Sequence, residues 1–305
     1  MKKHYSLLLA FLVAFSSIFV SCDENDNDSD STICKITVIS DGDGAVSITN
    51  YIGTSVNVLI GNNVEVVATP GSGSKFIGWY ISSSNEPVSL DEKFIFIASE
   101  NTTLVARFEK IKHEAIDLGL PSGIKWATMN VGATSPEDYG GYYAWGETEE
   151  KSNYSWSTYK WCNGSYDTMT KYCTNSKYGT VDNKTVLDPD DDVAHVKWGG
   201  SWRMPTNAEQ DELRNNCTWT WTTQNGVNGY KVTSKTNGNS IFLPAAGHRS
   251  GTYLDDSWSY GYYWSSSFYE DYSYNAYNLN FDSGYFGWNR YYYRCSGFSV
   301  RPVSE

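Results

Sequence analysis

The chain has 305 residues, enough for about two domains, and its formal charge is -12 at pH 7. A mean hydropathy of -0.47 excludes a protein with several membrane-spanning helices, and an aromatic content of 16% argues against disorder and favours β structure. Because nucleic-acid affinity depends on Lys and Arg that neutralise phosphates, the acidic balance argues against a nucleic-acid partner.

The N-terminus predicts a signal peptide at residues 1–21. Two lysines precede an apolar run over residues 7–20, which as a helix reaches only ~21 Å and is too short to cross a ~30 Å hydrocarbon core comfortably. A charged start followed by a short apolar run is typical of a secretory signal. Residues 19–22, Phe-Val-Ser-Cys, resemble a lipobox, which implies a bacterial lipoprotein with its lipid on Cys22. An ordinary signal peptide with a chance cysteine is the alternative.

An acidic tether is predicted at residues 22–32, where Asp and Glu are mixed with Asn and Ser. The run resembles the export signal that sends some Gram-negative lipoproteins to the outer leaflet. The resemblance implies a protein anchored in the cell outer membrane through Cys22 and exposed at the surface. A solvated tether of self-repelling charge is the plainer interpretation, and the two are compatible.

Residues 33–110 alternate apolar and polar side chains in short runs that are separated by turn residues. No helical period stands out, so this unit is predicted to be a small all-β domain. Residues 64–70, 76–79 and 102–108 resemble the divergent internalin-type B-repeat, or bacterial repeat domain. That family implies a β-rich module of surface proteins that often serves as a spacer.

Residues 113–305 form a second unit with more Trp, Tyr, Gly, Asn and Ser, predicted as a β-rich α+β domain. Thr206 and Glu209 form a capping box that starts a helix to about Asn215, with Leu213 facing inward. Irregular loops are expected over residues 146–200. The predicted strands cover residues 124–129, 141–145, 240–245, 262–266, 274–281 and 298–303.

A series of motifs runs through this unit in a fixed order. They lie at residues 117–123, 125–128, 130–133, 201–206, 243–247, 263–266 and 297–303. Together they resemble the Fibrobacter succinogenes major paralogous domain family. That family is similar to C-type-lectin-like folds, in which the first and last strands pair and irregular loops carry a ligand surface. The resemblance implies a C-type-lectin-like domain after the repeat domain.

Five cysteines remain if Cys22 carries a lipid. Cys34 alternates with apolar residues and is expected to be a buried thiol. Cys162 and Cys173 are close in sequence and could close a local loop, which would leave Cys217 and Cys295 as a long-range disulfide. Because four cysteines allow three pairings, this pairing is only a preference.

A calcium site is the one cofactor hypothesis that the sequence raises, and no cofactor is required. Several carboxylates on a flexible loop suit Ca²⁺, which takes six to eight oxygen ligands. Their spacing does not match an EF-hand, and a solvated acidic turn is the alternative. The candidate ligands are Asp188, Asp190, Asp191 and Asp192.

The sequence favours a protein that is not an enzyme, since it contains neither a G-x-S-x-G elbow nor an H-E-x-x-H pair. A hydrolytic group built from His113, His195 and His248 is the alternative. Formylglycine-generating enzymes are related in fold and use redox cysteines near the C-terminus. Only Cys295 lies there, beside a structural motif.

The C-terminal third predicts a binding surface, because 12 of the 24 tyrosines lie between Tyr253 and Tyr293 and exposed aromatic clusters usually bind a ligand. Leu279 and Phe281 are expected to face inward and the asparagines beside them outward. About half of the aromatics, Trp264 above all, are expected in the core. The candidate ligand-binding residues are Tyr269, Asp271, Tyr272, Tyr274, Asn278, Asn280, Tyr285, Trp288, Asn289, Tyr291, Tyr292 and Tyr293.

Residues 269–293 are dense in Tyr, Asn, Ser and Asp. Proteins diversified by retroelements carry such residues on C-type-lectin-like loops near the C-terminus, so a variable ligand-binding face is a further hypothesis. The leading function is non-catalytic recognition of a glycan or a surface protein, with stacking on Tyr and Trp. The alternatives are a structural component of a cell-surface or fimbria-like assembly and a formylglycine-generating-enzyme-like or hydrolytic enzyme.

Overall fold

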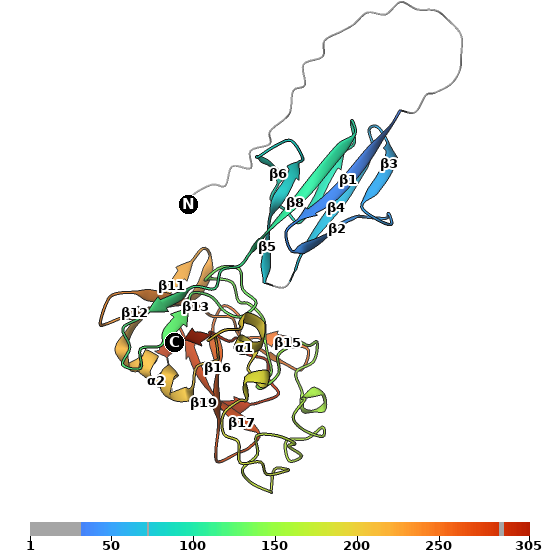
Figure 1. Ribbon diagram of the computed structural model, residues 1–305. Coiled ribbons are helices and arrows are strands. Elements are labelled where there is room, and N and C mark those ends of the chain that lie inside the picture. The colour runs from blue at the N-terminus through green and yellow to red at the C-terminus, as the bar shows by residue number, and fades with distance from the viewer. Residues whose placement is uncertain (1–31, 72, 287–289) are drawn as a thin grey trace, which may run out of the picture.

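The computed structural model describes residues 32–71, 73–286 and 290–305, which form two β-rich lobes (Figure 1). The predicted signal peptide, and Cys22 with nearly all of the predicted tether, lie outside these residues. Within the described ranges, no helix is long and apolar enough to span a membrane.

The first lobe contains two sheets packed around one core, as the alternating sequence predicts. One sheet has the order β3-β1-β8-β5-β6 and the other β2-β4-β7. Along β1, β4 and β8, every second side chain in the middle of the strand is buried, and Trp79 on β5 is fully enclosed between the sheets. Cys34 lies in this core as a buried thiol, as predicted. The strands are β1 (Ile33–Asp41), β2 (Gly44–Ile48), β3 (Ser55–Leu59), β4 (Asn63–Pro70), β5 (Ser74–Ile81), β6 (Pro87–Ser89), β7 (Lys93–Ile97) and β8 (Thr102–Lys110).

In the second lobe, the first and last strands belong to the same sheet. β9 (Ala115–Asp117) and β20 (Val303–Ser304) lie on either side of β10 (Lys125–Ala127), both antiparallel to it. Trp126 pairs with Ile116 on one side and with Val303 on the other. The two ends of the unit therefore close on each other, and the rest of the chain lies between them.

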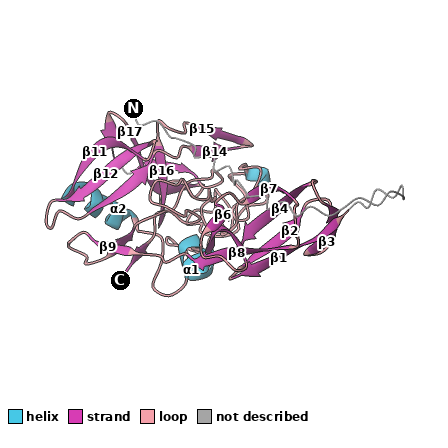
Figure 2. Ribbon diagram, turned by 90° about the horizontal axis from the view of Figure 1, so that it is seen from above, coloured by secondary structure: helices cyan, strands magenta, loops and turns pink. Residues whose placement is uncertain are grey.

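The remaining strands of this lobe form three further small sheets, with few and short helices among them (Figure 2). Their bounds are β11 (Cys217–Gln224), β12 (Val227–Ser234), β13 (Ser240–Pro244), β14 (His248–Ser250), β15 (Tyr253–Asp255), β16 (Gly261–Phe268), β17 (Asn275–Asp282), β18 (Tyr285–Phe286) and β19 (Arg290–Tyr293). Strand β16 separates two of the hydrophobic clusters of this lobe, because Tyr263 packs into one of them and Trp264 into another.

The predicted helix is confirmed as α2 (Asn207–Asn216). Thr206 accepts from the Glu209 main-chain NH and the Glu209 carboxylate accepts from the Thr206 NH, so the capping box is complete. Leu213 is fully buried, as predicted. The expected loops at residues 146–200 are present, with η1 (Trp156–Thr158), η2 (Pro189–Asp191) and α1 (Val193–Trp198) within them.

Two predicted strands are wrong in extent. Residues 141–145 form one isolated bridge between Tyr143 and Phe298, and the segment at 298–303 joins a sheet only at its last residue. Both segments are deep in the core, where their side chains are buried on all sides. Burial, rather than sheet pairing, explains their apolar composition.

Arg301 lies fully buried at the centre of the second lobe, and no ion pair joins it to a carboxylate among the described residues. Its guanidinium donates to Asn130 Oδ1 at 2.9 Å, to the Ala127 and Thr128 carbonyls at 3.1 Å each, and to the Phe242 carbonyl at 2.9 Å. Burial lowers the pKa of Arg301 to about 10, so the group remains charged at neutral pH. One side chain thus joins the C-terminal segment to two others, at residues 127–130 and at residue 242.

We expect Arg301→Met to lower the free energy of unfolding of the second lobe by about 3 kcal/mol, because four buried acceptors lose their donors. Arg214→Met on α2, where the arginine forms a partly exposed pair with Asp211 at 3.0 Å, should change it by less than about 1 kcal/mol. Urea unfolding of the full chain, followed by tryptophan fluorescence, measures both. Equal losses in the two variants would contradict the central role of Arg301.

Candidate functional site

The pairing of β17 with β19 decides which C-terminal tyrosines reach the surface. Tyr277 pairs with Tyr291, and Ala276 with Tyr292. Because side chains alternate across a strand, Tyr291 and Tyr293 face outward, with exposed fractions of 45% and 53%. Tyr292 turns toward the core, where its ring lies 5.2 Å from that of Phe298.

The chain between β16 and β17 forms a turn that adds three more rings to this face. Asn275 NH donates to the Tyr272 carbonyl at 2.8 Å, and Tyr269 NH donates to the Asn275 carbonyl at 3.2 Å. The Tyr269 ring stacks on that of Tyr291, with centroids 4.0 Å apart and planes within 18°. Tyr274 lies 5.6 Å from Tyr272, so the rings form a continuous aromatic surface.

These rings surround a hollow of about 390 Å³, which we call the tyrosine hollow. Its volume is within the range of small-molecule sites in proteins. None of its lining residues carries a charge. They are Tyr272, Tyr274, Asn275, Tyr291, Tyr292 and Tyr293.

The irregular loop of residues 146–200 supports the aromatic surface. Tyr178 and Tyr166 pack against Tyr274 with ring centroids 5.2 Å and 5.3 Å apart, and Trp156 packs against Tyr293 at 5.9 Å. Sequence reasoning missed this contribution, because nothing in the spacing of these aromatics indicates which distant strand they contact.

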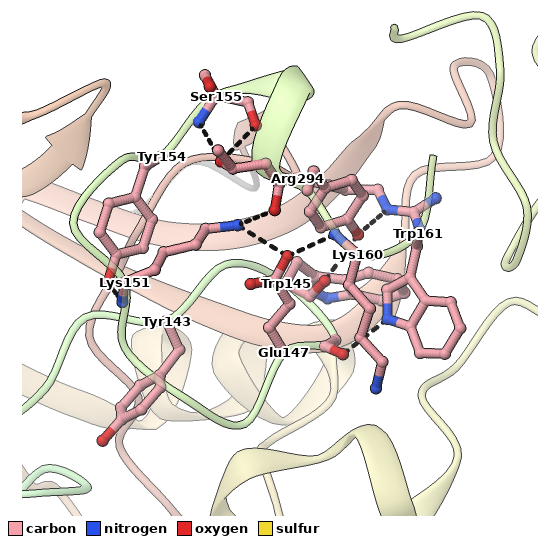
Figure 3. Close-up of polar contacts among 12 residues, drawn as sticks. Tyr143, Trp145, Glu147, Lys151, Tyr154, Ser155, Lys160, Trp161 and Arg294 are labelled. Carbon is pink, nitrogen blue, oxygen red and sulfur yellow. Dashed lines mark hydrogen bonds and ion pairs between the residues drawn. The ribbon is translucent and has the colours of Figure 1, made fainter. Parts of the chain in front are cut away.

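Arg294 is hydrogen-bonded to this loop (Figure 3). It follows Tyr293 directly, is fully buried, and lies 4.8 Å over the Trp145 ring. Its Nε donates to the Tyr159 hydroxyl at 2.9 Å, and its Nη1 donates to the Ser273 carbonyl at 2.6 Å. It also donates to the main-chain carbonyls of residues 171 and 172. The two walls of the hollow and the loop behind them therefore share one anchor.

A second set of polar contacts joins residues within the same loop. The buried Glu147 accepts from Lys151 Nζ and from the Lys160 main-chain NH, both at 2.8 Å (Figure 3). Lys151 Nζ also donates to the Thr158 carbonyl at 3.1 Å. These bonds satisfy polar groups that an irregular loop would otherwise leave without partners.

Three of the phenols in this region stay protonated well into the alkaline range. The hydrogen bond from Tyr269 to the Asp271 carboxylate, 2.9 Å long, raises the pKa of Tyr269 to about 12. Burial raises the pKa of Tyr274 and of Tyr292. At neutral pH these groups are uncharged and can donate and accept hydrogen bonds.

The structure brings seven of the predicted ligand-binding residues together: Tyr269, Asp271, Tyr272, Tyr274, Tyr291, Tyr292 and Tyr293. Tyr285 is half-buried on β18 and does not line the hollow. Trp288 and Asn289 lie outside the described residues.

The prediction that Asn278 and Asn280 face outward is wrong. Their exposed fractions are 1% and 8%, and the inward residues Leu279 and Phe281 are buried as predicted. The physical reason is the position of β17, an inner strand between β16 and the pair β18 and β19. Both of its faces are covered there, so alternation does not lead to exposure.

The four aspartates of the predicted calcium site do not form a ligand set. Asp191 pairs with Lys171 at 2.5 Å and accepts from the Tyr172 hydroxyl at 2.7 Å. Asp192 caps α1 and accepts from the Ala194, His195 and Met204 main-chain NH groups. Asp188 pairs with Lys171 and Lys184, and Asp190 is exposed. Within the described ranges, no group of three or more His, Cys, Asp or Glu could hold a metal.

The predicted disulfides are also wrong, because all five cysteines in the described part of the chain are free and buried. Cys217 and Cys295 lie in different hydrophobic clusters. Cys162 and Cys173 share a cluster, but their thiols donate to the Trp156 and Asn175 carbonyls, each at 3.2 Å. These thiols pack as small apolar groups.

The three histidines of the enzyme alternative lie in separate environments. His113 stacks on Trp198 at 3.7 Å, and His195 Nδ1 contacts the Trp202 carbonyl at 3.3 Å. His248 is buried against Tyr262 and Tyr292, and this burial lowers its pKa. Burial raises the pKa of the Cys295 thiol to about 12, so it is protonated at neutral pH.

Comparison with family models matches residues 34–112 to the divergent InlB B-repeat domain. This match supports the predicted bacterial repeat domain in the first lobe. Searches of the curated proteins and of the solved structures found no match.

We expect Asp191→Asn to lower the free energy of unfolding by about 2 kcal/mol, because two lysines and a tyrosine lose a charged, buried partner. Asp190→Asn, one residue earlier and exposed, should change it by less than about 0.5 kcal/mol. Thermal and urea unfolding measure the difference, with EDTA and with added Ca²⁺. A calcium-dependent stabilisation that Asp191→Asn abolishes would restore the metal interpretation.

Proposed function

We propose that this chain is a surface-exposed lipoprotein with a non-catalytic binding module, and that the tyrosine hollow binds a glycan. The observation that carries the proposal is the set of exposed rings, Tyr272, Tyr291 and Tyr293, around an uncharged hollow. Tyrosine offers a rigid apolar face and a polar tip, which suits the apolar face and hydroxyl edge of a sugar ring.

The shape of the site favours a glycan over a protein ligand. A hollow of about 390 Å³ suits one or two sugar rings, whereas a stable protein interface covers about 800 Å² on each partner and centres on a packed apolar core. The rim supplies the hydroxyls of several tyrosines, so a sugar would lose few hydrogen bonds on leaving water.

Three features support a non-catalytic role. The hollow is lined only by tyrosines and one asparagine, and neither residue type supplies a general base at neutral pH when it is uncharged. His248 lies behind Tyr292 with its pKa lowered by burial. Cys295 holds its proton.

The proposal includes a C-type-lectin-like domain related to the Fibrobacter succinogenes major paralogous family. In support, the first and last strands of the second lobe both pair with β10, and long loops lie between them. Calcium is not part of the proposed mechanism. The first lobe, with its repeat-domain match, would act as a spacer between the outer membrane and the binding site.

Screening the full chain against a glycan array should give saturable binding that Tyr291→Ala weakens at least tenfold. The reason is that this ring stacks on Tyr269 and is 45% exposed at the hollow, so its removal opens the binding surface. Tyr253→Ala is the matched control, since Tyr253 is 72% exposed on β15 and does not line the hollow.

Equal effects of Tyr291→Ala and Tyr253→Ala would contradict the assignment of the site. A folded protein that binds no glycan but captures one purified surface protein would favour a protein ligand. Concentration-dependent oligomers without any ligand would favour the assembly alternative.

Lipid attachment has its own test. Expressed in a Gram-negative host with a clickable palmitate analogue, the chain should take up label and fractionate with the outer membrane. Cys22→Ala should abolish the label, because Cys22 is the proposed acceptor, whereas Cys34→Ala should retain it, because Cys34 is a buried core thiol. Label that persists in Cys22→Ala would refute the anchor.

A further inference from the structure

One polar side chain in the tyrosine hollow has no structural explanation. Asn275 is only 4% exposed, yet it lines the hollow. Its Oδ1 accepts no hydrogen bond from any of the described residues. An amide oxygen withdrawn from water without a donor is costly, and such groups in folded proteins call for a reason.

The position of this side chain is set by the main chain around it. Asn275 pairs with Tyr293 in the ladder of β17 and β19. Its main-chain NH donates to the Tyr272 carbonyl, and its carbonyl accepts from the Tyr269 NH. The backbone is therefore fully bonded, and the side-chain oxygen is the group left without a partner.

We propose that the Asn275 side chain turns toward the tyrosine hollow when a neutral pyranose stacks on its rings, and that Oδ1 then accepts a hydrogen bond from a sugar hydroxyl group. This inference rests on the proposed glycan-binding function and assigns the residue that orients the sugar. Aromatic rings alone bind many sugars, because stacking depends only on the apolar face of the sugar and not on the positions of its hydroxyl groups. One acceptor that turns into the hollow adds a directional requirement.

The charges at the surface of the site favour a neutral sugar over an acidic one, because the donors of the buried Arg294 below it are taken up by the Tyr159 hydroxyl and main-chain carbonyls. No lining residue is charged, and Glu270 and Asp271 are exposed on the adjoining turn. The whole chain carries a formal charge of -12. Uronic acids and sialic acids would meet repulsion here, whereas a hexopyranose with equatorial hydroxyls offers a flat apolar face to the rings and donors at its edge.

Asn280 provides a matched control on the same strand. It is 8% exposed, and its Oδ1 also lacks a partner among the described residues, but it does not line the hollow. The same Asn→Ala change at the two positions therefore separates a contact with the ligand from a general effect of losing a buried amide.

The experiment measures binding of the full chain to neutral oligosaccharides by calorimetry, with cellotetraose, maltotetraose and mannotetraose as probes and tri-galacturonate as the acidic comparison. At least one neutral probe should bind, and the acidic probe should bind at least tenfold more weakly. Asn275→Ala should weaken the neutral complex at least tenfold, and Asn280→Ala by less than twofold. Asn275→Ala should melt within a few degrees of the parent, because the lost oxygen has no partner in the free protein.

The outcomes separate this inference from the function on which it rests. Neutral binding that is lost in Tyr291→Ala but kept in Asn275→Ala would overturn the role of Asn275 and leave the glycan site in place. Binding of none of the probes would count against both the inference and the glycan function. A large drop in the melting temperature of Asn275→Ala would show a structural role for the amide and overturn the proposal. Tighter binding of the acidic probe would overturn the choice of a neutral sugar.

Discussion

The second lobe depends on two buried arginines that are neutralised by dipoles, without an ion pair to a carboxylate among the described residues. Arg301 and Arg294 lie seven positions apart in the C-terminal segment, and each donates to main-chain carbonyls of distant segments. A carbonyl at the end of a strand, on an edge strand or in a loop can lack a sheet partner, and a planar guanidinium with five donors can satisfy several of them at once. A fold with long loops and short strands needs such a group in its interior.

The arginines also explain why the tyrosines remain at the surface. Arg294 fixes the chain directly after Tyr293, and its bond to the Ser273 carbonyl fixes the chain directly before Tyr274. Because Arg294 fixes both walls of the hollow, the tyrosine rings keep their positions although they are exposed. The hollow is thus formed in the free protein, so the proposed ligand would lose less entropy on binding.

The sequence predicted the elements whose signals are local. The capping box at Thr206 marked the start of α2, and period-two alternation revealed the first lobe. A missed element had an equally local signal: Asn225-Gly226, both with positive φ, is the tight turn between β11 and β12. The tyrosine hollow was predicted in part, because the density of tyrosine pointed to the segment that forms most of its lining. The contacts of Tyr166, Tyr178 and Arg294 could not be predicted from the sequence, because they depend on which loop covers which strand.

Burial limits which residues of the C-terminal segment can vary between related sequences. Strand β17 and the inward side of β19 belong to the core, where Ala276 and Phe281 are fully buried and Asn278 is enclosed. Exposed positions such as Tyr272, Tyr291 and Tyr293 contact mainly other aromatic rings. If this face is diversified, substitutions can accumulate at these outward positions without loss of the fold, whereas a change at Arg294 would release both walls of the hollow together. In this segment, the positions that can vary are therefore the outward ones of the two-residue strand period. The inward positions and Arg294 must be kept for the fold.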